Sequence, residues 1–286
     1  MAKVLLIIIS VLVVLTLFIY GISSIANVVF NIKVNKEVAL LFENGNDSAV
    51  KQIIKEKDLE GLPGCVQKWL RYAQVVGKER ITFVRSKQTA RLRTKEGQPW
   101  MTANTKAYYS VTQPGFIWQA KIKAAPLVHI AGRDKYYQAR GNMLIKPLSL
   151  FTAADASGKE IDQGSLLRYL AESVWFPTAA LNNYITWEEI NSNSATATMS
   201  YQGVTASGVF TFNEKGEVVS FLAERYMESQ GKFSLETWFI PLSHYQEFDG
   251  YKIPTRGEAI WKLDTGDFKW YQFELIDIEY NIPAIY

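Results

Sequence analysis

The stretch SATATMSYQGVTASGVFTF, residues 194–212, decides the fold class of this chain. Ala195, Ala197 and Met199 alternate with polar residues, and the same period of two returns after Gln202-Gly203. Such alternation is typical of a strand with one buried face, and a glycine-containing pair between two such runs indicates a tight turn. The stretch therefore predicts two antiparallel strands joined by a hairpin.

The same pattern continues on both sides of this hairpin. Residues 116–123 alternate between apolar and other side chains, and turn signals at 213–216, 248–250 and 264–267 separate further runs. In the last run the apolar phase changes at Leu275, which predicts a β-bulge there. The connections are too short for crossover helices, so we expect a strongly curved antiparallel half-barrel of roughly ten strands.

One helix interrupts the strands, at residues 165–175. Pro177 prevents its continuation, and Asp162 or Ser165 is a candidate cap at its start. Its apolar face consists of Leu166, Leu167, Leu170 and Val174. Because a curved sheet needs a covering element on its concave side, we expect this helix to lie there. The fold class predicted is therefore α+β.

The N-terminal segment is apolar throughout. No charged residue occurs from Val4 to Ile32, which is long enough to cross a bilayer and longer than the core of a cleaved signal. Residues 21–26 are the nearest candidate for a cleavage site, but a retained single-pass anchor is favoured. Lys3 favours an extracytoplasmic domain, whereas Lys33 and Lys36 favour the opposite orientation. An N-terminal anchor usually exports the domain behind it, so we expect an extracytoplasmic location in the cell envelope.

The chain is expected to have three parts. Residues 1–32 form the transmembrane anchor, residues 33–78 a helical connector, and residues 79–286 the curved β domain. The connector is predicted from apolar stripes at helical spacing, which include Val50, with a turn signal at 44–47.

Composition excludes several classes of function. The 286 residues carry a net charge of +3, which is too small and too scattered for a nucleic-acid-binding surface. Cys65 is the single cysteine, and neither His129 nor His244 has a second histidine at ligand spacing. Phosphate-loop, dinucleotide and hydrolase motifs are absent from the sequence. We therefore predict no cofactor and no metal.

The most informative group of residues surrounds the predicted helix. Arg168 and Glu172 are four residues apart and share one helical face. They form either a stabilising surface pair or the mouth of a cavity, where Arg168 would hold an anionic head group. The second interpretation predicts a ligand-binding site formed by Trp118, Met143, Arg168, Leu170, Glu172, Trp175 and Phe176. Simple core packing of the aromatic members is the alternative.

Other charged residues within the strand-like runs have ordinary explanations. Gly132-Arg-Asp134 is interpreted as a turn between two strands. Arg225 and Glu258 lie inside strand runs and are expected to face solvent. If they point inward instead, each requires a partner, because an unpaired buried charge is costly.

Several motifs stand out over roughly residues 80–280, namely 114–120, 132–134, 157–160, 168–178, Trp187, the region of Arg225, 249–258 and Trp261. With these motifs the chain resembles a family of uncharacterised, membrane-anchored bacterial proteins of unknown function. The resemblance implies no reaction. More distantly, the order of elements is similar to periplasmic lipoprotein carriers, in which a curved sheet encloses an apolar cavity behind a helical lid; this is a likeness of fold alone.

These observations favour a membrane-tethered, non-catalytic protein that binds a lipid or other amphiphile. One alternative is an envelope hydrolase that uses Glu172 with another acid, for which candidates are Glu160, Asp162, Glu188 and Glu189. A second alternative is a structural or assembly protein with a protein partner.

Overall fold

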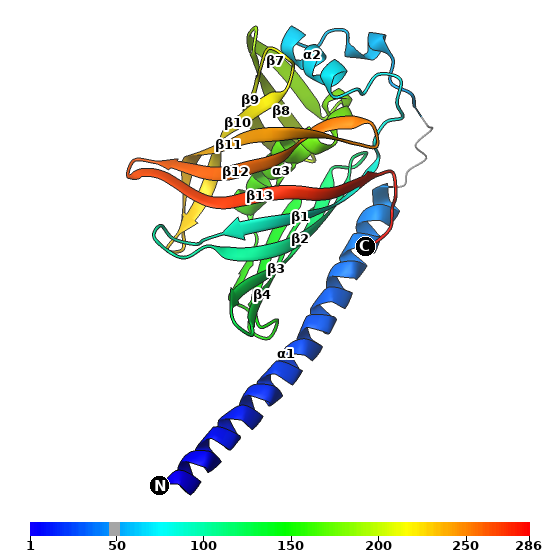
Figure 1. Cartoon of the computed structure of the whole chain (residues 1–286). Helices are drawn as coiled ribbons and strands as arrows, with labels where there is room; N and C mark the ends of the chain where they lie inside the picture. Colours follow the sequence, from blue (N-terminus) through cyan, green and yellow to red (C-terminus); the bar gives the residue numbers. More distant parts are fainter. Residues whose placement is uncertain (46–51) are drawn as a thin grey trace.

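The computed structural model describes residues 1–45 and 52–286, and it begins with one long helix, α1 (Ala2–Gly45). At 1.5 Å per residue this helix is about 66 Å long. Residues 1–22 are exposed and project away from the rest of the chain (Figure 1). By length and composition α1 can cross a membrane. Val50 and the second half of the turn expected at 44–47 lie outside the described residues.

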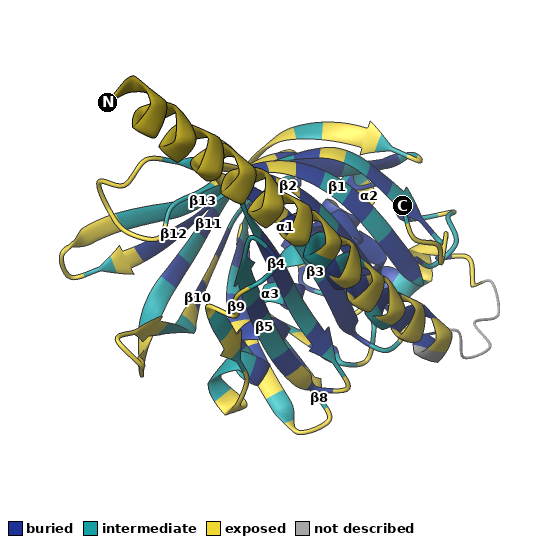
Figure 2. Cartoon of the chain, turned by 90° about the horizontal axis from the view of Figure 1, so that it is seen from below, coloured by how far each residue is buried: buried dark blue, intermediate teal, exposed yellow. Residues whose placement is uncertain are grey.

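The second half of α1 packs on the outer, convex face of the sheet (Figure 2). Ser23 makes the first contact, where its hydroxyl donates to the carbonyl of Leu148 at 2.8 Å. The buried side chains then recur every three or four positions, as one helical face requires. They are Phe30, Val34, Val38, Leu41 and Phe42. Because neither glycine nor proline occurs in residues 33–44, α1 continues without interruption past residue 32, where the anchor was expected to end.

Two short helical elements link α1 to the sheet, namely the 3-10 turn η1 (Glu56–Leu59) and helix α2 (Gly64–Tyr72). Pro63 precedes the first turn of α2, a position that tolerates the missing N–H. Trp69 of α2 is fully buried, and its ring lies 6.2 Å from that of Phe210 and 6.0 Å from that of Phe212. Helix α2 therefore belongs to the main core.

Thirteen strands form one antiparallel sheet in the described chain, against the roughly ten expected. The strand order is β6-β5-β4-β3-β2-β1-β13-β12-β11-β10-β9-β8-β7, so two meanders meet where β1 pairs with β13. The strands are β1 (Phe83–Leu92), β2 (Met101–Ser110), β3 (Gly115–Ala125), β4 (Val128–Tyr137), β5 (Arg140–Pro147), β6 (Ala154–Ala156), β7 (Ile185–Asn191), β8 (Ser194–Tyr201), β9 (Val204–Phe212), β10 (Val218–Ser229), β11 (Lys232–Phe248), β12 (Tyr251–Leu263) and β13 (Gly266–Tyr280).

Two local predictions about the strands have opposite outcomes. The bulge near Leu275 is confirmed, because Lys87 faces Asp277 while Gln88 faces Leu275, which leaves one extra residue in β13. The turn predicted at residues 132–134 is wrong, since these residues lie in the middle of β4. A glycine followed by two charged residues resembles a turn, but here Arg133 is buried against α1 and its guanidinium pairs with Glu37 at 3.0 Å.

Helix α3 (Lys159–Glu172) covers the concave face, as expected, but begins six residues earlier than predicted. It packs on β4 and β5 of one meander and on β8, β9 and β10 of the other. Its first turn follows Gly158, and neither predicted cap acts there. Asp162 lies inside the helix, where its carboxylate accepts a hydrogen bond from the backbone N–H of Gly141 at 2.7 Å. The chain continues through the 3-10 turns η2 (Ser173–Trp175) and η3 (Pro177–Leu181).

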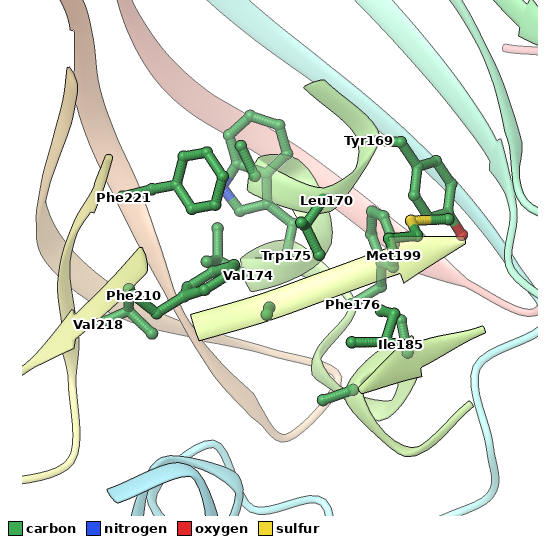
Figure 3. Packing of buried hydrophobic residues seen from close by; sticks show 14 of the residues in the cluster. Tyr169, Leu170, Val174, Trp175, Phe176, Ile185, Met199, Phe210, Val218 and Phe221 are labelled. Carbon is green, nitrogen blue, oxygen red and sulfur yellow. The ribbon is translucent and has the colours of Figure 1, made fainter. Parts of the chain in front are cut away.

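The main core lies between α3, the two 3-10 turns and the strands beneath them. Large side chains from both sides interlock there, as Figure 3 shows for Tyr169, Leu170, Phe176, Phe210 and Phe221. Phe210 contacts Phe221 edge to face at a centroid distance of 4.8 Å. This end of the half-barrel is closed by packing.

Candidate functional site on the concave face of the sheet

A charged cluster lies between α3 and the floor of the sheet. Arg168 of α3 donates from Nε to Glu172 at 2.9 Å and from Nη1 to Asp134 of β4 at 2.6 Å. The predicted pair of Arg168 and Glu172 therefore exists, and Asp134 makes it a triad. The hydroxyl of Tyr109 donates to the second oxygen of Glu172 at 3.1 Å. All three charged side chains are only 14–16% exposed, so Arg168 and Glu172 do not form an exposed surface pair.

The cluster stabilises the charge of Arg168 but not that of Glu172. Burial alone would lower the pKa of Arg168, but the carboxylates of Glu172 and Asp134 outweigh it and raise that pKa above its ordinary value. Burial raises the pKa of Glu172, and Arg168 opposes this rise without cancelling it. Arg168 is thus a cation whose two nearest positions are already occupied by carboxylates. The head-group role predicted for it would require displacing one of them.

Aromatic rings lie beneath this arginine. The guanidinium carbon of Arg168 is 4.9 Å from the ring of Phe116 and 5.0 Å from that of Trp118, both on β3. Met143 of β5 lies opposite Asp134 in the strand register and on the same face. The structure therefore brings together four of the predicted site residues, namely Trp118, Met143, Arg168 and Glu172.

The other three predicted residues lie in the main core. Leu170 and Phe176 are fully buried, and Trp175 is 3% exposed. The indole N–H of Trp175 donates to the carbonyl of Pro254 at 3.0 Å, so its polar atom is satisfied within the protein. These side chains close the α3 end of the half-barrel, as the alternative interpretation of core packing expected.

Beyond the charged cluster, the concave face carries a second apolar cluster, which shares Trp118, Tyr271 and Phe273 with the edge of the main core. Its floor consists of Ala90, Ala103, Ala120 and Ile122, which the strand pairing places on neighbouring strands. Half-buried side chains surround this floor, namely Leu92, Met101, Trp118, Ile130, Tyr271 and Phe273. We call these ten residues the concave-end cluster. Small residues below and partly exposed large residues above give this end an apolar surface that α3 does not cover.

Sequence reasoning left out several residues of this face. Asp134 was hidden in an apparent turn, and Tyr109 and Tyr271 had no signal beyond their alternation. Arg225 was singled out only on the condition that it pointed inward, and it does, over the ring of Trp238. Glu258 faces the other way and pairs with Lys269 at 2.6 Å.

Acidic residues considered for hydrolysis do not form a second group. Glu160 and Asp162 lie on the first turns of α3, where Asp162 also pairs with Arg140. Glu188 and Glu189 are exposed on the edge strand β7. Within residues 1–45 and 52–286, no three His, Cys, Asp or Glu side chains are placed to hold a metal ion.

Two hollows lie elsewhere on the molecule. One, of about 520 Å³, separates α1 from the outer face of the sheet and is lined by polar side chains such as Asn31, Lys106 and Gln119. The other, of about 640 Å³, lies beside the start of α3, near Lys135 and Arg140. Neither includes a residue of the predicted ligand-binding site, although Asp162 lines the second.

Fold and site together define a class of protein: an antiparallel half-barrel with a covering helix, preceded by an apolar helix that can cross a membrane. The model of a family described as "Family of unknown function (DUF6544)" matches residues 52–273, and the chain belongs to that family. No curated protein is significantly similar in sequence.

Several solved structures are distantly similar in fold. A DUF1329 family protein from Desulfovibrio piger has a TM-score of 0.44 and 10% identity, covering 77% of this chain and 93% of its own. A putative outer membrane lipoprotein-sorting protein domain from Vibrio parahaemolyticus has a TM-score of 0.37 and 10% identity, with coverages of 76% and 91%. A LolA superfamily protein from Nitrosomonas europaea has a TM-score of 0.37 and 8% identity, with coverages of 75% and 92%.

Proposed function

We propose that this protein is a membrane-tethered, non-catalytic binding protein for a lipid or other amphiphile, with α1 as its anchor. The observation that carries the proposal is the concave-end cluster. Apolar side chains that remain partly exposed in a concave face are typical of ligand-binding surfaces. Four predicted site residues, Trp118, Met143, Arg168 and Glu172, lie in this cluster or at its border with the charged triad.

The shape of the site suits an apolar chain better than a compact polar ligand. Three of the four floor positions are small alanines, at most 5% exposed, and Trp118, Tyr271 and Phe273 supply flat apolar side chains around them. Trp175 packs edge to face on Phe273 at 5.3 Å, so one wall is supported by the rigid core. An amphiphile bound here would lie along the floor with its polar group toward the charged side chains.

Photolabelling tests the proposal in the full chain. The protein, in its membrane, is exposed to a palmitate analogue that carries a diazirine on its acyl chain, and labelled residues are mapped by mass spectrometry. We expect labels on concave residues of β1, β2, β3 and β13 as well as on α1. Labels confined to residues 2–45 would contradict the proposal, because a membrane helix alone meets lipid.

A matched pair of variants sharpens this test. Ala103→Leu fills the floor and is expected to reduce labelling of the concave residues severalfold, since added volume displaces the chain. Thr102→Leu introduces the same side chain at the neighbouring, exposed position on the opposite face of β2 and should leave the labelling unchanged.

A further inference from the structure

Arg225 lies on the concave face and forms no ion pair with any residue in 1–45 and 52–286; Asp134 and Glu172 act on it only from a distance. It lies on β10 with its guanidinium carbon 4.5 Å from the ring of Trp238 and 5.9 Å from that of Trp261. A Cβ atom placed on Gly164 of α3 would be 3.6 Å from Nε of Arg225, so the side chain extends beneath that helix.

The polar atoms of Arg225 are poorly satisfied. Its Nε is buried and has no hydrogen-bond partner in the described chain. Glu236 lies opposite it in the strand register, yet no ion pair joins the two side chains in residues 1–45 and 52–286. Burial lowers the pKa of Arg225 to about 10, which still leaves the group positively charged at neutral pH. A buried cation of this kind favours an anion that supplies the missing acceptors.

Arg168, on the same face, has acceptors for its guanidinium. Asp134 and Glu172 lie within 3 Å of that guanidinium, and both form ion pairs with it. Neither carboxylate forms an ion pair with Arg225 in the described part of the chain. The indole N–H of Trp238, the ring under Arg225, is also buried without an acceptor. Two neighbouring donors are therefore without acceptors at one place on the concave face.

A row of apolar side chains that belong to the main core leads from this place toward the concave-end cluster. Trp238 pairs across the strands with Trp261, and Ala259 on the same strand pairs with Tyr271. From β10 to β1 there are four strand spacings, or about 19 Å along the sheet. This distance is comparable with the length of a long acyl chain.

We infer that Arg225, together with the indole N–H of Trp238, binds the anionic group of the ligand, a carboxylate or a phosphate, while the apolar chain lies over Trp261 and Tyr271 toward the concave-end cluster. This inference depends on the proposed function, which it deepens by naming the class of ligand. Arg168 then acts as a structural cation that holds α3 to β4. Arginine suits the task because its planar fork can donate two hydrogen bonds to one carboxylate or phosphate.

The test compares two probes in the full chain. One is the diazirine palmitate described above, and the other is the corresponding primary alcohol, which has the same chain and no charge. In Arg225→Met we expect labelling of concave residues by the acid to fall about tenfold, because charge-assisted hydrogen bonds are lost, while labelling by the alcohol changes little. Arg256→Met is the matched control, since Arg256 is exposed and pairs with Glu274.

Each outcome decides a separate point. Equal labelling by the acid in the wild type and in Arg225→Met would overturn the role of Arg225 and leave the proposed function intact. An equal loss of labelling with both probes in Arg225→Met would mean that the substitution damages the structure, and it would also overturn the role of Arg225. No concave labelling by either probe in the wild type would overturn the proposed function itself, and this inference with it.

Two additions complete the experiment. Inorganic phosphate is added as a competitor, and the inference expects it to compete weakly because it lacks the apolar chain; complete displacement at low concentration would assign the site to a free anion instead. Arg225→Gln is the second neutral variant if the thermal midpoint Tm shows that Arg225→Met folds poorly, and the same tenfold loss is expected of it.

Discussion

The two ends of the concave face differ in what covers them. At one end α3 packs on β9 and β10, the ring of Phe176 packs on those of Tyr109 and Tyr169, and the core is filled. At the other end the floor residues are mostly alanines, and their large neighbours Trp118 and Tyr271 remain half-buried. One sheet thus provides a packed core, which gives stability, and an uncovered apolar surface, on which a ligand can bind.

The same contrast applies to the two arginines of this face. Arg168 has two carboxylates at hydrogen-bonding distance, whereas Arg225 has aromatic rings and no ion pair among the described residues. Carboxylates of the protein supply the acceptors for Arg168, whereas we propose that a ligand supplies those for Arg225. Three substitutions, given in order of expected effect, test this division.

Phe176→Ala is expected to have the largest effect on stability. Removing a fully buried ring from the closed end should lower the free energy of unfolding by about 4 kcal/mol. Urea unfolding of the detergent-solubilised chain, followed by tryptophan fluorescence, measures the change. Phe273→Ala at the open end is the comparison and should cost about half as much, because its ring is already partly exposed. Equal losses would remove the distinction between the two ends.

Arg168→Met should have the next largest effect. It leaves Asp134 and Glu172 in a half-buried site without their shared cation, at a cost of about 3 kcal/mol. The same unfolding measurement applies. Arg256→Met breaks an exposed pair whose members are about half exposed, and it is expected to cost at most ~0.5 kcal/mol. If both variants lost the same small amount, the triad would not be the structural unit that its geometry indicates.

Glu172→Gln should have the smallest effect, visible mainly in the pH dependence of stability. Burial raises the pKa of Glu172 in the folded protein above its ordinary value of 4.5, so the folded state binds that proton more tightly than the unfolded chain does. Stability from this group is therefore present below pH 4.5 and is lost as the pH rises through the folded pKa.

The measurement is the free energy of unfolding of the wild type and of Glu172→Gln between pH 4.5 and pH 8. We expect the advantage of the wild type over the variant to decrease as the pH rises across this interval. Two parallel curves, or an advantage that increases with pH, would show that Arg168 compensates the burial of Glu172 completely.

Local patterns predicted much of this molecule because each depends on neighbours in the chain. Alternation with a period of two identified strands such as 194–201 and 204–212, and a change of phase identified the bulge beside Leu275. Spacing by four residues paired Arg168 with Glu172. The start of α3 was predicted less well, because Gly158 rather than a polar cap precedes its first turn.

The candidate site was predicted only in part. Trp118, Arg168 and Glu172 do lie together, but Trp175 and Phe176 were assigned to the ligand and lie in the core. From sequence, an aromatic residue beside a helix end has the same pattern in both roles. The role of such a residue depends on whether another element covers it. For Trp175 and Phe176, α3 and the strands beneath that helix provide the cover.

By itself the sequence determined the apolar N-terminal helix, the antiparallel class of the sheet and the presence of a covering helix, since hydrophobic periodicity and turn chemistry are local properties. Tertiary structure alone decided that Asp134 joins Arg168 across 34 residues of chain, that Arg225 faces inward without an ion pair, and that α1 packs on the outer face. The physical reason is that the cost of a buried charge and the fate of an apolar side chain depend on which strands become neighbours and which face they share. The order of the strands and the position of the covering helices therefore determine both the cost of a buried charge and the burial of an apolar side chain.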